Sequence, residues 1–179
     1  MTAAALARNL IIASVAIGTI FLSFDTRSQA APRRLPPVLR AISDEVGALS
    51  VPEGQALASI LADVKQKSGV EIIVVVAETT GAESIEEYTQ RLSAHWRAYG
   101  RSPDGERRVF VVVAVADCSL RIASEKQMAS VVEQVTKSPL MTDLLPMFRH
   151  GEYFRALALI VEQLSRAIGS LPSAGDNAT

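Results

Sequence analysis

The stretch that decides the fold spans residues 69–88 and reads GVEIIVVVAETTGAESIEEY. Its continuous apolar run, residues 72–77, predicts that a strand over residues 71–77 is buried on both faces. The polar segment TTGAE, residues 79–83, ends this strand. Ser84 with Glu87 three residues later forms a capping-box signature, so a helix is expected to start here. A strand, a polar loop and a helix in this order are typical of an α/β protein, in which binding sites often lie at such loops. This loop is short and poor in glycine, however, so it shows no phosphate-binding chemistry of its own.

The same signals recur on both sides of this stretch. Residues 109–116 predict a second buried strand. A turn is predicted at residues 117–119, and residues 120–123 predict a third strand. Helices are predicted where capping signals precede apolar residues at helical spacing. These helices lie between Ser50 and Gly69, from Ser84 to Gly100, from Ser124 to Ser138, around Asp143 to Arg149 and from Tyr153 to Ile168. Capping boxes at Ser50–Glu53, Ser84–Glu87 and Ser124–Gln127 mark the first three.

The resulting order, α-β-α-β-β-α-α-α, predicts a single three-layer α/β sandwich with a small mixed sheet covered by helices on both faces. The first two strands are joined through a helix and are expected to be parallel with a right-handed crossover. The third strand is expected to be antiparallel to the second. We assign the domain to residues 42–169, a proline- and arginine-rich linker to residues 31–41, and a flexible tail to residues 170–179.

The first thirty residues predict a targeting segment. An uncharged apolar run, residues 10–24, precedes Ser28-Gln29-Ala30, where small residues occupy the positions that a signal peptidase reads. The run is shorter than the roughly 20 residues of a spanning helix, which favours a cleaved signal peptide. An uncleaved N-terminal anchor is the alternative, and a mitochondrial presequence fits less well because the run is so apolar. The protein is therefore expected in an exported, periplasmic or lumen-like compartment.

Composition excludes several classes of function. The formal net charge of −1 gives no general reason to expect nucleic-acid binding. Cys118 is the only cysteine, so no intramolecular disulfide is available, and with two distant histidines it makes no zinc pattern. The sequence contains no GxGxxG, P-loop, HExxH or GxSxG motif.

Four segments together resemble the TPM domain family. They are ISDEVGALS (42–50), SGVEIIVVVAETTGAESIEEYTQRLSAHW (68–96), VFVVVAVADCSLRI (109–122) and LLPMFRHGEYFRAL (144–157). The family includes thylakoid-lumen and photosystem-repair proteins, many exported bacterial proteins and a receptor-modulating animal membrane protein. The resemblance therefore implies a membrane or a membrane-protein complex as partner. It also implies calcium or magnesium binding, and a proposed acid-phosphatase activity, for some members.

Two segments depart from the family pattern. An Asp-Asn-Gly-type segment is replaced by PDGERR (103–108), and a glycine-rich loop by ASEKQM (123–128). The topology places both at one end of the sheet. A remnant anion or metal site there would use the candidate ligand-binding residues Asp104, Glu106, Arg107, Arg108 and Lys126. The three cations would repel a divalent metal and could attract an anion, so no metal cofactor is expected here. The sequence SPDG also reads simply as turn chemistry.

Acidic residues follow the strands at the opposite end of the predicted sheet. Asp44 and Asp117 are candidate metal ligands, together with Glu78 and Glu83, because calcium takes six to eight oxygen atoms. The simpler interpretation is that they are solvated loop acids and a helix cap, as most surface acids are.

No catalytic residue is assigned. Ser124 lacks a visible base, and His95 has no visible catalytic partner. His150 precedes Gly151, where a polar or positive residue suits the C-terminus of a helix. The first functional hypothesis is an exported accessory factor that maintains or assembles a membrane complex without catalysis. The resemblance supports a phosphate-ester hydrolase as the alternative, and a small anion- or metal-binding module is the third. The sequence does not indicate an oligomeric state.

Overall fold

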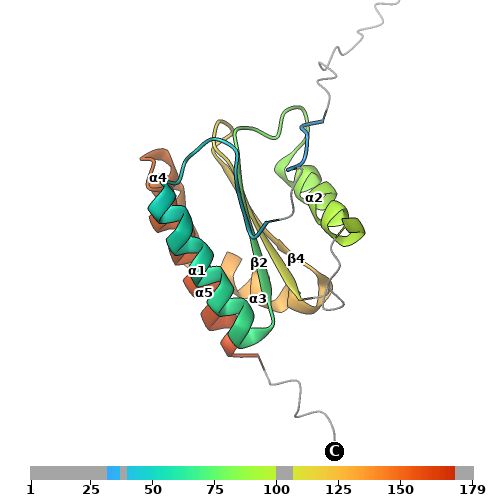
Figure 1. Cartoon of the computed structure of the whole chain (residues 1–179), viewed down its shortest axis with the longest axis vertical. Coiled ribbons are helices and arrows are strands. Elements are labelled where there is room, and N and C mark those ends of the chain that lie inside the picture. The colour runs from blue at the N-terminus through green and yellow to red at the C-terminus, as the bar shows by residue number, and fades with distance from the viewer. Residues whose placement is uncertain (1–31, 37–39, 100–106, 172–179) are drawn as a thin grey trace, which may run out of the picture.

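The computed structural model describes residues 32–36, 40–99 and 107–171, and these residues form an α/β sandwich (Figure 1). The strands are β1 (Ile42–Asp44), β2 (Glu71–Ala77), β3 (Arg108–Ala114) and β4 (Ser119–Ser124). The helices are α1 (Val51–Ser68), α2 (Ile85–Tyr99), α3 (Ala129–Thr136), α4 (Leu140–Arg149) and α5 (Tyr153–Gly169). A 3-10 turn, Lys126–Met128, precedes α3. The predicted fold class is confirmed.

The described strands form one mixed sheet in the order β1-β2-β3-β4. β2 is parallel to β3 and β4 is antiparallel to β3, as expected from the connections. The sequence did not predict β1, which pairs in parallel with β2 and places Ile42 opposite Val74. Three residues are too few to show a periodicity of their own, and β1 forms because β2 offers an open edge.

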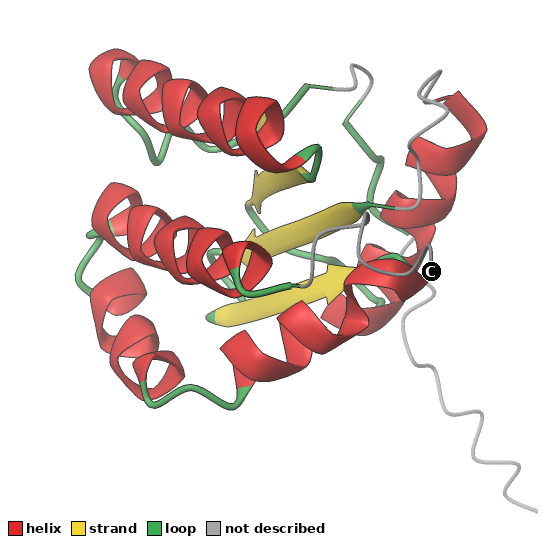
Figure 2. Ribbon diagram, turned by 90° about the horizontal axis from the view of Figure 1, so that it is seen from below, coloured by secondary structure: helices red, strands yellow, loops and turns green. Residues whose placement is uncertain are grey.

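Helices cover both faces of the sheet. In Figure 1, α2 lies on one side of the strands and α1, α4 and α5 lie on the other, and Figure 2 shows the strands enclosed by helices. Ile73, Val75, Phe110 and Val112 pack under α2. The alternate residues of β2 and β3, such as Val74 and Val111, pack under α1, α3, α4 and α5. The apolar runs are therefore buried on both faces, as predicted.

The helix α2 attaches through one stripe. Tyr88 and Leu92 are fully buried and Trp96 is 7% exposed, and all three pack against β2 and β3. The capping box that starts this helix is confirmed. The Ser84 N–H donates to Glu87 Oε2 at 2.8 Å, and the Glu87 N–H donates to Ser84 Oγ at 3.2 Å.

The predicted capping box at Ser124–Gln127 was wrong. Ser124 is the last residue of β4, and α3 begins only at Ala129, after the 3-10 turn. The Glu125 N–H donates to the Arg108 carbonyl at 3.1 Å, so pairing with β3 continues past Ser124 and delays the helix. β3 also ends at Ala114, two residues before the predicted end, and α4 begins at Leu140.

Several predicted segments lie outside the described residues. These are the targeting segment 1–30, most of the tail 170–179, part of the linker 31–41 and the residues Asp104 and Glu106. Among the helices that the structure describes, none has the length and apolar character needed to cross a membrane.

Candidate functional site

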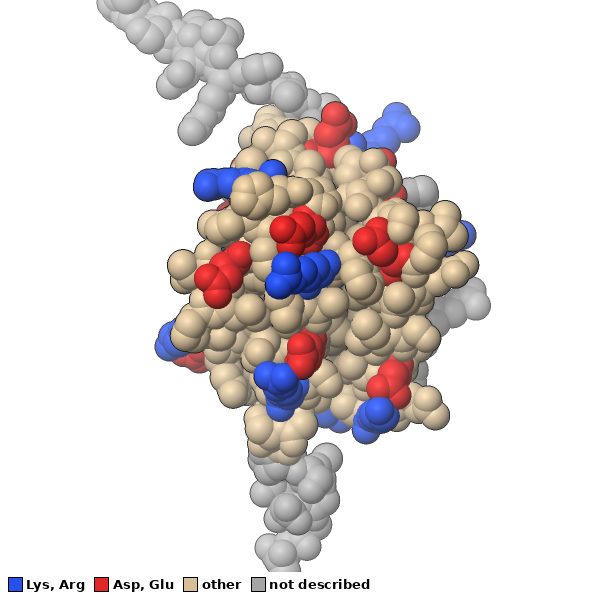
Figure 3. Space-filling model, turned by 90° about the vertical axis from the view of Figure 1, so that its left-hand side faces the viewer, with Lys and Arg blue, Asp and Glu red and all other residues tan. Residues whose placement is uncertain are grey.

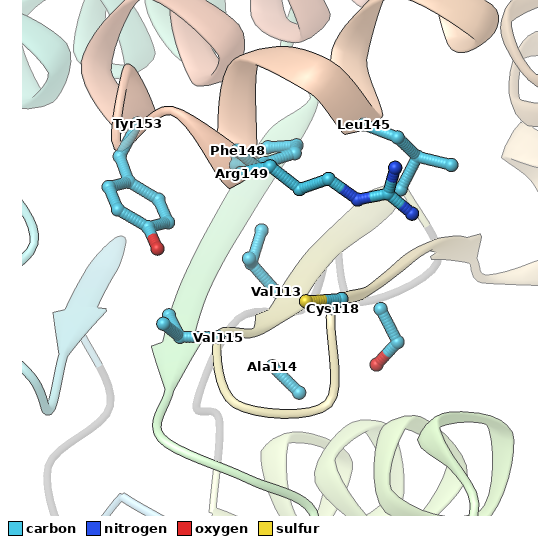
Figure 4. Close-up of a pocket in the computed structure, with 9 residues that line it drawn as sticks. Val113, Ala114, Val115, Cys118, Leu145, Phe148, Arg149 and Tyr153 are labelled. Atoms are coloured by element: carbon cyan, nitrogen blue, oxygen red, sulfur yellow. The ribbon is translucent and has the colours of Figure 1, made fainter.

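A small recess, with a cavity volume of about 20 Å³, opens where the β3–β4 hairpin meets the junction of α4 and α5 (Figure 4). It is lined by Val113, Ala114, Val115, Cys118, Ser119, Leu145, Phe148, Arg149 and Tyr153. Its walls are mainly apolar, and its polar groups are a guanidinium, a thiol, a serine hydroxyl and a phenol. This volume has room for about one water molecule, far less than the roughly 300 Å³ or more of a pocket that encloses a small ligand.

The hairpin turn that forms one wall is held by backbone bonds. The Val115 N–H donates to the Ala77 carbonyl at 3.0 Å, and the Ala116 N–H donates to the Glu78 carbonyl at 2.7 Å. Cys118 closes the turn with a φ of 47°, a left-handed conformation that non-glycine residues seldom adopt. The turn therefore presents an exposed thiol beside the recess.

The other wall comes from the tight junction between α4 and α5. Gly151 has a φ of 77°, and the Glu152 N–H donates to the Met147 carbonyl at 2.9 Å. The ring centroids of Phe148 and Tyr153 are 5.8 Å apart, so the two helices are locked through these rings. Figure 4 shows Arg149 reaching toward Leu145 on the side nearest Cys118, with Tyr153 on the other side.

Arg149 gives the recess a positive group. It is exposed, and no acidic side chain of the described residues forms an ion pair with it. An exposed guanidinium at the rim of so small a recess suits contact with an anionic group, such as a carboxylate or phosphate, at the surface. Among the recess residues, none is a carboxylate or a histidine, so they include no general base.

Asp44, a predicted metal candidate, organises the loop that follows β1. Its Oδ1 accepts from the Val46 N–H at 3.2 Å and from the Ala48 N–H at 3.1 Å. Its Oδ2 accepts from the Leu49 N–H at 2.8 Å. The carboxylate thus caps three backbone donors of its own loop.

Asp117, the second metal candidate, links the hairpin turn to the loop between β2 and α2. Its carboxylate accepts from the Thr80 N–H at 2.7 Å and from the Thr79 hydroxyl at 2.8 Å. Desolvation opposes ionisation, but the hydrogen bonds from Thr80 and Thr79 outweigh it and lower the pKa of the Asp117 carboxyl. Asp117 is therefore held as an anion that fastens two loops together.

The other acids at this end are also paired. Arg33 contacts Glu45 at 3.2 Å and Glu78 at 3.4 Å, and Arg91 pairs with Glu83. Among the residues that the structure describes, no group of three or more histidine, cysteine, aspartate or glutamate side chains could hold a metal ion. The sequence predicts these acids at one end of the sheet, and in the structure each has a partner in an ion pair or a hydrogen bond, with Arg33 shared by Glu45 and Glu78.

At the opposite end, Arg108 differs most from its expected place. Its side chain is 2% exposed, and its Nε donates to Glu71 Oε2 at 2.9 Å. Lys65 contacts the other oxygen of Glu71 at 2.6 Å. Desolvation opposes ionisation of Glu71, but hydrogen bonds from Lys65 and Arg108 lower its pKa overall. Arg108 is thus a core ion-pair member and not a surface ligand group.

Arg107 and Lys126 lie near this pair. The Arg107 carbonyl accepts from the Glu71 N–H at 2.9 Å, and Lys126 is exposed in the 3-10 turn. Within the described residues neither side chain has an acidic partner at ion-pair distance. Asp104 and Glu106, the acidic members of this predicted group, lie outside the described residues.

Sequence reasoning missed Arg149 and Tyr153 as recess residues. Both lie in the segment LLPMFRHGEYFRAL (144–157), which carries part of the family resemblance. That segment was the available signal, but nothing in the residue spacing places it against Cys118.

Comparison with known proteins gives a family and a fold. The family model described as TPM domain matches residues 42–167. A search of curated proteins found no match. The similar solved structures include three that were determined by NMR, and at these identities they support the fold alone. The N-terminal domain of the cg2496 protein from Corynebacterium glutamicum has 14% identity and a TM-score of 0.56, covering 79% of this chain and 90% of that one. An N-terminal domain from P. gingivalis has 21% identity and a TM-score of 0.62, covering 74% and 84%. The BA42 protein from Bizionia argentinensis has 19% identity and a TM-score of 0.58, covering 72% and 87%.

Proposed function

Because the chain belongs to the TPM domain family, we propose that it is an exported accessory factor of the cell envelope, without a catalytic activity of its own. In this role it helps to maintain or assemble a membrane complex by binding one of the components. The carboxylates at the carboxyl end of the sheet are the main support for this proposal, because they already bind donors in the loops.

Those carboxylates serve the loops. Asp44 caps three backbone N–H groups, and Asp117 accepts from Thr79 and Thr80. Calcium takes six to eight oxygens, whereas these two carboxylates serve separate loops, and no three acidic, cysteine or histidine side chains of the described residues come together as a metal site. This observation favours a binding module over a metal-dependent hydrolase.

The amino end of the sheet offers no better metal site. Arg107 and Lys126 are cations without described acidic partners. Repulsion between one such cation and a divalent metal several ångströms away is about 1 kcal/mol or more near a protein surface. This end therefore favours anions over metals.

One observation favours the alternative, a phosphate-ester hydrolase. The Cys118 thiol, the Ser119 hydroxyl and the Arg149 guanidinium line the same recess. A nucleophile beside a guanidinium is a pairing that phosphoryl transfer uses, although the described residues of the recess include no base to activate it.

Calorimetric titration with calcium and magnesium, and an aryl phosphate assay at acidic and neutral pH, separate the two functions. We expect no saturable metal binding at millimolar concentration and no turnover above background. Turnover that is lost in Cys118→Ala or Asp104→Ala, and retained in the exposed control Arg155→Ala, would establish the hydrolase. Saturable calcium binding that is lost in Asp117→Asn would establish a metal module.

Export is tested by intact mass of the protein from its native host. We expect the mature chain to begin near Ala31, because small residues precede that position. A soluble cytoplasmic form that retains Met1 would contradict export.

A further inference from the structure

The outer faces of α1 and α5 form an apolar groove. The two helices lie side by side on the sheet, and all residues that line the groove, which has a volume of about 620 Å³, come from them. Figure 3 views the molecule from this side and shows charges of both signs scattered over a surface made mostly of other residues. Ile60 is 38% exposed in the groove, and Phe154 and Leu159 are partly exposed. Apolar side chains gathered in an exposed groove are typical of an interaction surface.

The exposed face of α1 is uncharged over most of its length. Surface helices usually carry charged residues on the side away from the core. Between Glu53 and Asp63, α1 has no charged residue, although six positions there are exposed. These are Gln55, Ala56, Ala58, Ser59, Ile60 and Ala62. Such a face can leave water at little cost, because few charged groups would lose their hydration.

The charged groups around the groove are balanced. α1, α5 and the residue before α5 carry four acidic and four basic side chains, namely Glu53, Asp63, Glu152, Glu162, Lys65, Lys67, Arg155 and Arg166. Most of them form ion pairs with close neighbours in the sequence, as Arg155 does with Glu152 at 3.0 Å and Arg166 does with Glu162. A strongly acidic or strongly basic partner therefore finds no complementary field on this face.

The charges along α5 complement those of a second α5 that runs in the opposite direction. Four charged residues on the exposed face alternate in sign, at separations of three, seven and four residues that keep them on one side of the helix: Glu152, Arg155, Glu162 and Arg166. The outer two and the inner two share a midpoint next to Leu159. An antiparallel second copy would therefore place Arg155 beside Glu162 of that copy, and Glu152 beside its Arg166. A parallel copy of α5 would bring each charge toward its own duplicate, which is destabilising.

We propose that the α1–α5 face binds a second copy of this chain, with the two α5 helices antiparallel across a two-fold axis near Leu159. In this dimer Ile60, Phe154 and Leu159 of both copies leave water, and the ion pairs of one α5 lie beside those of the other. The inference goes beyond the proposed accessory function and does not depend on it.

The size of the face predicts a reversible dimer. α1 has 18 residues and α5 has 17, so each helix is about 25 Å long. Two such helices, each about 10 Å wide, present a face of about 500 Å². A stable interface of standard size buries about 800 Å² on each partner. We therefore expect a Kd of about 10–100 µM for the dimer.

The first test is sedimentation equilibrium of the protein in the form purified from its native host, over concentrations on both sides of this Kd. We expect the average mass to rise from one chain toward two. Ile60→Glu should raise the Kd about tenfold or more, because it places a charge in the apolar part of the interface. Leu145→Glu is the matched control, because Leu145 is 40% exposed and lies on α4, outside the groove. It should leave the Kd unchanged.

The second test uses charge reversal to identify the antiparallel arrangement. Arg155→Glu and Glu162→Arg should each raise the Kd about tenfold or more, because like charges then meet at two places across the axis. An equimolar mixture of the two variants should form a heterodimer about as tight as the wild-type dimer, because each reversed charge then meets an opposite one.

A matched mixture controls for general attraction between oppositely charged variants. Arg121→Glu and Glu86→Arg change the net charge by the same amounts, and they reverse an exposed ion pair of 3.5 Å between β4 and α2, away from the groove. Each of these variants, and their mixture, should dimerise as the wild type does.

Several results would overturn the inference. One is a mass of a single chain at every concentration, and another is a dimer that Ile60→Glu and Leu145→Glu weaken equally. A mixture of the two α5 variants that associates no better than either variant alone would exclude the antiparallel pairing. A dimer that a reductant dissociates would be held by Cys118, and a monomer that binds neutral phospholipid vesicles through Ile60 would assign the face to a membrane surface. These outcomes concern only the α1–α5 face, so they leave the accessory function to its own tests.

Discussion

At the scale of single residues, Tyr88 has the least usual environment of the described core. Its side chain is fully buried between α2 and the sheet, and its hydroxyl has no hydrogen-bond partner among the described residues. Burial, with a smaller contribution from the Glu45 charge, raises the pKa of the Tyr88 phenol to about 12. Arg91 lies over the ring at 5.5 Å from its centroid and opposes this shift. The phenol is thus kept neutral at a cost in unsatisfied hydrogen bonding.

Tyr88→Phe should therefore leave the free energy of unfolding at neutral pH unchanged or raise it by up to about 1 kcal/mol. The raised pKa of Tyr88 means that the neutral phenol stabilises the fold below pH 10, and that this contribution is lost as the pH rises from 10 toward 12. Tyr88→Phe should therefore lose less stability than the wild-type protein as the pH rises from 10 toward 12. Urea denaturation at pH 7 and at several values above pH 9 measures both effects, with Tyr153→Phe as a control at pH 7. A loss above about 1 kcal/mol at pH 7 would show that the hydroxyl is hydrogen-bonded.

At the scale of elements, the junction of α4 and α5 depends on one glycine. Gly151 has a φ of 77°, and no atom lies within 4 Å of the position where a Cβ would be added. A substitution there meets backbone strain without a steric clash. Gly54 in α1 also has free space at the Cβ position, but its backbone is helical. The two glycines thus separate the effect of φ from the effect of side-chain volume.

Gly151→Ala should destabilise the protein by about 1–2 kcal/mol, the usual cost of a left-handed residue with a Cβ. Gly54→Ala should stabilise it by about 0.5–1 kcal/mol, because alanine favours the helix. Thermal or urea denaturation of both variants measures the difference. If Gly151→Ala leaves the free energy of unfolding unchanged, the junction of α4 and α5 can adopt another turn. In that case the Gly151 turn does not fix the position of Arg149 at the recess.

The elements also show what a sequence can and cannot predict here. Residues 71–77 form a strand as expected, because a continuous apolar run fits only an element buried on both faces. The three residues of β1 gave no signal, since their pairing is set by the neighbouring strand. Ser124 carried a capping signal, yet pairing of the chain with β3 prevailed over it.

The candidate site was less predictable than the fold. Arg108 follows the polar segment PDGER (103–107) in the sequence and looked like a surface cation. In the structure it lies opposite Glu71 in the register of β2 and β3, and their ion pair allows the guanidinium to be buried. The recess at Cys118 joins residues about thirty positions apart. Their approach depends on how α4 packs on the sheet, which the periodicity of a helix does not specify.

At the scale of the whole molecule, two carboxylates hold the two ends of the sheet. Glu71 connects β2, β3 and α1 at one end through Arg108 and Lys65, and Asp117 connects two loops at the other end. The pKa of each carboxyl is lowered by these partners against the opposing effect of desolvation. A lowered pKa means that each ionised group stabilises the fold above its unfolded pKa, and that this contribution is lost as the pH falls through the folded value.

The contribution of the Glu71–Arg108 pair can be measured with a single and a double variant. Glu71→Leu alone leaves the Arg108 guanidinium, which is 2% exposed, without its partner, so it should cost about 3–5 kcal/mol at pH 7. Adding Arg108→Met removes the buried charge and should recover most of that loss, because an apolar pair of similar volume needs no compensation. The wild-type protein should lose stability as the pH falls below the ordinary glutamate value of 4.5, and the double variant should lose less. Urea denaturation of all three proteins at neutral pH and at several values below 5 tests both statements, with Asp117→Asn reporting the other end of the sheet. If Glu71→Leu costs less than about 1 kcal/mol, a group other than Glu71 compensates the Arg108 charge. If the double variant is as acid-sensitive as the wild type, the acid response of the fold arises from other groups.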